Sequence, residues 1–219
     1  MGVATFFHLS MPGFTTLRPL WAHRVPDRYL VVRAEWDNAP IYFHNVYAPV
    51  EAELRAAFFA TIPRDFESNS RHIVGGDLNF PMDATLDTTS YHTRHNAGNA
   101  QCCEWLSSLH VVDAWRMKDP DAKVLSGPRG RTRLDYIFVD VELTAYFHQL
   151  SSFDSNAFHG DHITHSTVLA SLPRVTLPAN ATTINFNFAT SPSYPPSPAR
   201  ISAEFDCAWA CVGSCGEGG

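Results

Sequence analysis

The chain has 219 residues, of which 45% are apolar and 17% are charged, and its formal net charge is −6. This length allows a sizeable buried core, and the apolar fraction excludes general disorder, while no apolar run approaches the roughly 20 residues that span a bilayer. The acidic balance gives no global reason to expect a nucleic-acid binder, although a local basic groove is compatible with it.

Cysteine usage and the N-terminal segment indicate the compartment. The chain has five cysteines, an odd number, and none lies in a CxxC pair, so a disulfide scaffold is not expected. The apolar residues 1–9 lack a basic region and a clear small-residue cleavage site, so no signal peptide is predicted. These features predict an intracellular protein with no membrane partner.

Composition divides the chain into three parts. Residues 1–28 are rich in aromatic residues and prolines, show no clean period and are left unassigned. Residues 29–171 alternate strand-like and helix-like segments and form the predicted domain. Residues 172–219 are rich in Pro, Ser and Thr and end in glycines, which predicts a disordered tail.

The domain begins with two predicted strands, residues 29–36 and 41–48. The link between them, Asp-Asn-Ala-Pro, is short and turn-rich, which predicts an antiparallel hairpin. Residues 51–62 predict a helix that ends before a proline. The apolar face expected for this helix consists of Leu54, Ala57, Phe58 and Ile62.

The second half of the domain continues this alternation. Residues 71–75 predict a short strand, and the polar residues 78–98 predict a loop. Residues 99–109 predict an amphipathic helix, and two more strands are predicted at 133–141 and 163–170. The inward side chains expected on the helix are Cys102, Trp105, Leu106 and Leu109. Strands connected partly by hairpins and partly by helices indicate a layered α/β or α+β domain.

Polar residues gather at the ends of the apolar strands. Carboxylate and amide oxygens suit the hard cation Mg²⁺, a carboxylate can activate water, and a histidine held by a second carboxylate can stabilise a phosphoryl transition state. The residues concerned are Asn45, Tyr47, Asp77, Asn79, Asp135, Asp161 and His162. Their combination predicts metal-assisted phosphoryl hydrolysis.

Each of these segments also has a structural interpretation. A Gly-Gly-Asp-x-Asn run is often only a turn, Asp135 can cap a neighbouring segment, and Tyr47 can belong to the core. The run His159, His162 and His165 has the spacing HxxHxxH, but side chains at this spacing on a strand would not converge on zinc. Chemistry is therefore favoured by the combination and not by any one segment.

Four motifs occur in a fixed order along the chain: NVYAP, GGDLN, RLDYIFV and GDH. In this order they resemble the endonuclease/exonuclease/phosphatase superfamily of DNase-I-like proteins, and the resemblance covers residues 29–171. The wider context GGDLNFPMDATLD, VVDAWR and RLDYIFVD is most similar to the endonuclease domains of non-LTR retrotransposons. The resemblance implies a four-layer α/β sandwich and implies DNA as the partner.

The resemblance also implies a role for each residue of the chemical step. Asp77 matches the aspartate that activates or positions the attacking water, and His162 matches the catalytic histidine. Asp135 matches the carboxylate that orients this histidine, and Asp161 the carboxylate that touches the metal site, to which Asp77 also contributes. The implied cofactor is Mg²⁺, with Mn²⁺ as a substitute.

A second group of residues is expected to contact phosphates. The resemblance places Asn79 against the phosphate and Tyr47 on the scissile phosphate, with Asn45 supporting the tyrosine. Arg131 and Arg133 lie in a basic segment that replaces the more usual Thr-aromatic pattern of the family. They are predicted to bind phosphates, and a solvated loop is the alternative.

The chain departs from the family pattern on its N-terminal side. The family has an early strand that ends in asparagine and another that ends in a glutamate, a principal Mg²⁺ ligand, and neither is present. Residues 1–26 contain no Asp or Glu, and Gly160 stands where many members have serine. The expected fold is therefore a DNase-I-like sandwich that is incomplete at the N-terminus and lacks one anionic metal ligand.

The resulting prediction is a Mg²⁺-dependent DNA endonuclease of the retroelement type, whose activity the missing glutamate puts in doubt. Two alternatives stay open. One is a phosphatase of the same superfamily that acts on a phosphorylated small molecule or lipid, and the other is a non-catalytic remnant or binding module. A monomer is expected, no protein partner is indicated, and a nuclear location follows only from the retroelement analogy.

Overall fold

The computed structural model describes residues 2–154, 161–169, 182–186 and 209–213, and among these the side chains of residues 2–143, 151–154 and 161–169. The helices are α1 (Ala52–Thr61), α2 (Asn99–Ser108) and α3 (Ala114–Lys118), with 3₁₀ turns η1 (Phe14–Thr16), η2 (Trp21–His23), η3 (Thr93–Asn96), η4 (Pro128–Gly130) and η5 (Val141–Tyr146). The strands are β1 (Ala4–His8), β2 (Arg18–Pro19), β3 (Tyr29–Trp36), β4 (Ala39–Tyr47), β5 (Arg71–Asp77), β6 (Val111–Asp113), β7 (Asp135–Asp140), β8 (Phe147–Asp154), β9 (Thr164–Leu169), β10 (Thr182–Phe186) and β11 (Trp209–Gly213).

The largest sheet has six strands in the order β2-β3-β4-β5-β7-β6. Strands β4 and β5 are parallel, and the other neighbouring pairs are antiparallel. The predicted hairpin is confirmed as β3 and β4, joined by Asp37 and Asn38 with φ angles of 56° and 58°. Two consecutive residues with positive φ form the hairpin turn whose twist matches that of the strands.

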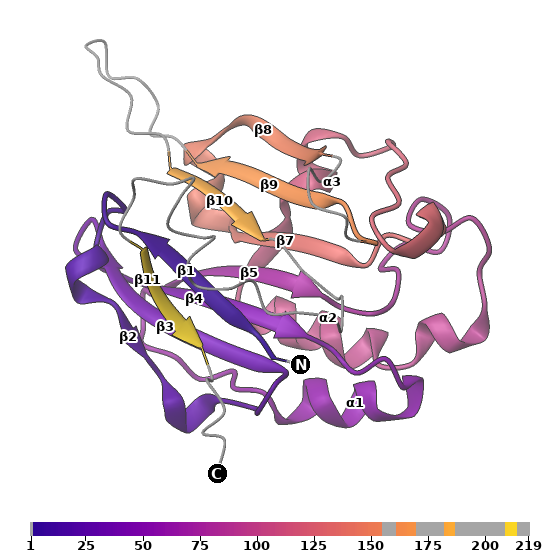
Figure 1. Ribbon diagram of the computed structural model, residues 1–219, viewed down its shortest axis with the longest axis horizontal. Coiled ribbons are helices and arrows are strands. Elements are labelled where there is room, and N and C mark those ends of the chain that lie inside the picture. The colour runs from indigo at the N-terminus through magenta and orange to yellow at the C-terminus, as the bar shows by residue number, and fades with distance from the viewer. Residues whose placement is uncertain (1, 155–160, 170–181, 187–208, 214–219) are drawn as a thin grey trace, which may run out of the picture.

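Alternating side chains of the six-stranded sheet pack into two separate cores. Tyr29 and Val31 lie in one cluster with residues of α1 and α2, whereas Leu30 and Val32 lie in a second cluster on the opposite face. This follows from the two-residue period of a strand. Figure 1 shows α1 and α2 side by side along the sheet, with β1 and β11 crossing in front of β3 and β4.

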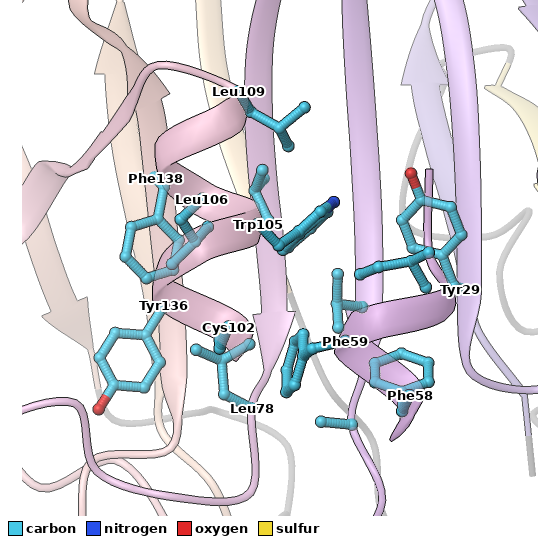
Figure 2. Close-up of a cluster of buried hydrophobic side chains, with 14 of the residues drawn as sticks. Tyr29, Phe58, Phe59, Leu78, Cys102, Trp105, Leu106, Leu109, Tyr136 and Phe138 are labelled. Atoms are coloured by element: carbon cyan, nitrogen blue, oxygen red, sulfur yellow. The ribbon is translucent and has the colours of Figure 1, made fainter. Parts of the chain in front are cut away.

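The helical layer is built on large aromatic side chains. Figure 2 shows Trp105 of α2 between Phe59 of α1 and Phe138 of β7, and the indole N–H of Trp105 donates to the carbonyl of Pro63 at 2.9 Å. The inward residues predicted for α2 are all buried, which confirms that face. The face predicted for α1 was partly wrong, because Leu54 and Ala57 are exposed and Arg55 and Phe59 are buried instead. Phe58 and Ile62 are buried, as predicted.

The second face of the sheet is covered by two small antiparallel sheets. The strand pair β1-β11 lies over β3 and β4, where the rings of Phe7 and Phe43 are 5.2 Å apart, and the other small sheet has the order β10-β9-β8. Strands β10 and β11 fall within residues 172–219, for which composition predicts disorder, and the rest of that segment lies outside the described residues. The predicted α/β class, with a central mixed sheet and helices, is confirmed.

Some elements were not predicted from the sequence. They are β1, β2, β6, α3 and β8, together with the two strands of the C-terminal segment. In the part of the chain that the structure describes, no helix is both long enough and apolar enough to cross a membrane.

Candidate active site

Strand pairing places three of the predicted site residues in one row of the large sheet. Tyr47 is paired with Asp77 across the parallel strands β4 and β5, and Asp77 is paired with Asp135 across β5 and β7. Because β4 and β5 run in parallel, their C-terminal ends meet at the same edge, and the antiparallel β7 begins there. The sheet topology thus brings together residues that are far apart in the sequence.

A glycine allows this close approach of β4 and β5. A Cβ atom on Gly76 would lie 2.0 Å from the carbonyl oxygen of Val46. No side chain can be accommodated at that distance, so the Gly-Gly pair of the GGDLN motif has a packing function beside Asp77. The interpretation of this pair as only a sharp turn was therefore incomplete, since Gly76 lies within β5.

His162 completes the cluster from the segment that precedes β9. Its Nδ1 lies 2.8 Å from Oδ2 of Asp135, and both residues are buried. Asp77, Asp135 and His162 each offer a ligand atom, and these atoms all lie within 4.8 Å of one another. The structure thus brings together three of the residues to which the resemblance gave a catalytic role.

Burial and proximity change the protonation of the cluster. Burial, together with the neighbouring charge of Asp135, raises the pKa of Asp77 to about 7. For His162, burial opposes the charged form, but the hydrogen bond and charge of Asp135 outweigh it and raise the pKa. A buried carboxyl and an imidazole that both have raised pKa values are typical of groups that transfer protons.

The donor atoms of the cluster fit a divalent cation. Two carboxylates and one imidazole converge, and Oδ1 of Asp135 is buried without a hydrogen-bond partner among the described residues. A carboxylate oxygen in that state is stabilised by a cation, and such oxygens suit Mg²⁺ and Mn²⁺, with the imidazole better suited to Mn²⁺. Asp161, predicted as a metal ligand, is exposed and is not part of this three-residue cluster, although its charge contributes to the raised pKa of His162.

Asn79 lies directly after β5 and lines a pocket together with residues of α1. Its backbone has a φ of 58°, which asparagine tolerates better than most residues. Its N–H donates to Oδ1 of Asp77 at 2.8 Å, and its side-chain amide donates to the carbonyl of Ala48 at 2.7 Å. A pocket of about 490 Å³ opens next to Asn79 and Leu134, and its lining includes Arg94.

The positively charged side chain of Arg28 lies beside Tyr47, and the sequence analysis did not identify it. The guanidinium of Arg28 lies 4.9 Å from the centre of the Tyr47 ring, and its Nη1 donates to the carbonyl of Ala48 at 3.3 Å. Arg28 directly precedes β3, and only its position as a basic residue before a predicted strand could have indicated it. It adds a positive charge beside the residue expected to touch the scissile phosphate.

Two other predicted residues occupy structural positions. Asn45 is buried, and its amide nitrogen donates to the carbonyl of Ala4 at 2.8 Å and to Oγ1 of Thr5 at 3.2 Å, which holds β1 against the sheet. Arg133 is fully buried, with its guanidinium on Asp113, and so lacks the position expected of a phosphate-binding group.

The remaining basic residues lie apart from the cluster. Arg131 is exposed, as a phosphate contact or a solvated loop would require. His165 is buried, its Nε2 lies 2.8 Å from Oγ of Ser151, and its ring stacks on Phe153. His162 and His165 therefore do not share one metal ion, and His159 lies outside the described residues.

No family model matches the chain. Over 128 residues the chain is 27% identical to an uncharacterized 149 kDa protein of transposon TX1 from Xenopus laevis. This match covers 54% of the chain but only 10% of that protein, so the chain corresponds to a small part of the relative's length.

Several solved structures are similar to this chain. The chain is similar to the catalytic domain of Xenopus laevis APE2, with a TM-score of 0.52 and 17% identity over 78% of this chain and 60% of that one. The AP endonuclease LMAP from Leishmania major gives a TM-score of 0.49 with 18% identity, covering 73% and 59% of the two chains. The endonuclease domain of TRAS1, a telomere-specific non-LTR retrotransposon, gives 0.47 with 15% identity, covering 73% and 77%. The chain therefore shares the fold of the APE2 catalytic domain, in agreement with the DNase-I-like fold that its four sequence motifs predicted.

Proposed function

We propose that this chain hydrolyses phosphodiester bonds in DNA with a divalent cation held by the carboxylates of Asp77 and Asp135, beside the imidazole of His162. The observation that carries the proposal is the convergence of these three buried side chains within 4.8 Å. Two buried carboxylates side by side repel each other, and their burial costs free energy unless a positive charge compensates it. A bound cation would provide that charge and would lower the pKa of Asp77.

The roles of the residues follow from their protonation. The carboxylate of Asp77 accepts a proton from the attacking water as the oxygen of that water forms a bond to phosphorus. His162, held at Nδ1 by Asp135, donates a hydrogen bond from Nε2 to a phosphoryl oxygen in its protonated form. The bond between phosphorus and the leaving ester oxygen breaks, and that oxygen takes a proton from solvent. Bound Mg²⁺ supplies Lewis-acid stabilisation of the developing negative charge.

Substrate contacts are proposed for the residues beside the cluster. Tyr47, with the guanidinium of Arg28 over its ring, binds the scissile phosphate, and Asn79 holds its other side. The exposed Arg131 contacts a neighbouring phosphate, and Asp161 adds negative charge near the cation. The similarity to a transposon protein supports DNA as the substrate, whereas the nuclear location and the monomeric state remain predictions.

Relaxation of a supercoiled plasmid tests this function. The purified chain with Mg²⁺ should convert the plasmid to its nicked form, and Asp77→Ala and His162→Ala should each abolish nicking. Glu104→Gln, which changes an exposed carboxylate on α2, is the matched control and should leave nicking unchanged. Nicking that survives both site substitutions would show that the activity comes from elsewhere.

The two alternatives make different predictions in the same assay. Release of inorganic phosphate from a phosphorylated small molecule without any nicking would favour the phosphatase. The absence of both activities, combined with retained DNA binding, would favour a binding module.

A further inference from the structure

Ser126 lies in the loop that precedes η4 and is 1% exposed. Its hydroxyl oxygen accepts hydrogen bonds from the backbone N–H groups of Leu134 and Asp135, both at 3.0 Å. Its backbone carbonyl accepts a third bond, from the N–H of Ile163, also at 3.0 Å. Ser126 is thus hydrogen-bonded to the backbone at Asp135 and at Ile163, the residue directly after His162.

The same contacts extend to the strand that carries Asp77. The carbonyl of Leu134, whose N–H is held by Ser126, accepts a bond from the N–H of Leu78 at 2.9 Å. Each member of the cluster therefore has, at its own position or at the next one, a backbone N–H that is bonded either to Ser126 or to Leu134. Ser126 touches none of the reacting groups in these bonds and acts only on the backbone.

We infer that Ser126 is a positioning residue of the candidate site, which holds the backbone at Asp135 and Ile163 and so maintains the hydrogen bond between Asp135 and His162. This inference rests on the proposed function for its effect on catalysis, but its structural part does not. A serine at this position serves the purpose because one hydroxyl oxygen has two lone pairs and can accept from two amides.

The neighbouring glycine shows how closely this loop fits. A Cβ atom on Gly127 would lie 2.7 Å from the side chain of Leu134, and the N–H of Gly127 donates to the carbonyl of Thr132 at 2.8 Å. The loop therefore packs directly on the residue whose N–H Ser126 holds. Loss of the Ser126 hydroxyl leaves two buried N–H groups without their partner, and the backbone must move to satisfy them.

The ring N–H of His162 provides a readout that does not depend on activity. In the full chain, an imidazole N–H bonded to a carboxylate is protected from solvent and gives a downfield proton NMR signal, which His162→Gln assigns by removing it. Ser126→Ala should abolish this signal, and Ser126→Thr, which keeps the hydroxyl, should retain it. Ser151→Ala is the matched control, because it removes another buried serine hydroxyl that is bonded to His165.

Kinetics provide the second readout. In the plasmid assay, Ser126→Ala should lower kcat by about 10–100-fold with KM nearly unchanged, since a displacement of about 1 Å has such an effect. Ser126→Thr should restore most of the rate, and Ser151→Ala should leave it unchanged. If Ser126→Ala does not fold, Ser126→Cys keeps the size but replaces the oxygen by a weak acceptor, and the same loss of signal and rate is expected.

The outcomes separate this inference from the proposed function. A folded Ser126→Ala or Ser126→Cys variant that keeps the His162 signal would overturn the inference, as would the absence of that signal from the unsubstituted chain. Loss of the signal only in the Ser126 variants, in a protein that nicks no DNA, would support the positioning role and contradict the proposed function.

Discussion

Arg133 and Asp113 form a two-point ion pair inside the protein, with Nη1 and Nη2 of the arginine each 2.8 Å from one oxygen of the aspartate. Asp87 lies near the same guanidinium, 3.6 Å from Nη1, and the ring of Tyr136 lies 4.3 Å from its central carbon. The pair connects the start of β7 to the residue that precedes α3. It supports the strand that carries Asp135.

The first prediction concerns the stability that this pair provides. Arg133→Ala should lower the free energy of unfolding by about 3–5 kcal/mol, because it leaves the partly buried carboxylate of Asp113 without its counter-charge and removes a fully buried side chain. Arg131→Ala, two residues away and exposed, should change it by about 0.5 kcal/mol or less. Guanidinium unfolding measures both. Normal stability of Arg133→Ala together with weaker DNA binding would instead support the original prediction of a phosphate contact.

The second prediction concerns Asp77, whose raised pKa reduces the free energy of unfolding at neutral and higher pH. A carboxyl whose pKa rises from 3.8 to about 7 on folding binds more protons in the folded state, so the free energy of unfolding falls as the pH rises through this window. Without metal, Asp77→Asn should therefore be more stable than the original chain by about 2–4 kcal/mol at pH 8 and should differ little at pH 4. Chemical unfolding at both pH values tests this, and equal stability at pH 8 would contradict it.

The third prediction concerns cation binding to the metal-free protein. Mg²⁺ or Mn²⁺ should raise Tm with increasing concentration, because a ligand that binds only the folded state stabilises it by about 2.7 kcal/mol at one hundred times its Kd. EDTA should reverse the increase and abolish nicking. Asp135→Asn should remove the increase in Tm, whereas Glu104→Gln should keep it. An equal increase in all three proteins would locate the cation elsewhere.

The fourth prediction concerns a pair of buried histidines, His44 and His72, on the face of the sheet opposite to the candidate site. Nε2 of His44 lies 2.9 Å from Nδ1 of His72, and the hydroxyl of Tyr29 lies 2.7 Å from Nδ1 of His44. Burial, with a smaller contribution from His110, lowers the pKa of His72 to about 4. Burial also lowers the pKa of His44 well below its usual value.

These lowered pKa values make the fold sensitive to acid. The folded state binds fewer protons than the unfolded chain, so stability that is present above pH 6.5 is lost as the pH falls toward 4. His72→Gln should reduce the slope of the free energy of unfolding in this window, and His92→Gln, at an exposed position, should not. A slope that is unchanged in His72→Gln would show that other groups control the response.

Several features of the fold could be predicted from the sequence because their signals are local. The turn residues Asp37 and Asn38 sufficed to predict the hairpin, and the four-residue period of α2 predicted its buried face. The prediction for Leu54 failed because Arg55 is buried instead. Its guanidinium donates to the carbonyls of Pro49 and Val50, and a charged side chain satisfied by backbone partners cannot be recognised from periodicity.

The site required information that is not local. The GGDLN and RLDYIFV motifs indicated Asp77 and Asp135, but only the pairing of β5 with β7 places them opposite each other. Arg133 was predicted as a surface contact because its partner Asp113 is remote in sequence and the short strand β6 was not predicted. Ser126 gave no signal at all, since its function depends on three backbone bonds that form only in the folded chain.

The candidate site can form only in a certain order while the chain is being synthesised, because its residues are far apart in the sequence. They are Tyr47, Asp77, Asp135 and His162. At translation rates of about 5–20 residues per second, Asp77 leaves the ribosome several seconds before His162. The nascent chain can pair β3, β4 and β5 early, yet Asp135 and His162 reach Asp77 only after β7 and the segment at Ser126 have been added. The cluster can thus assemble only after His162 has been synthesised, so a shorter nascent chain would have no complete centre.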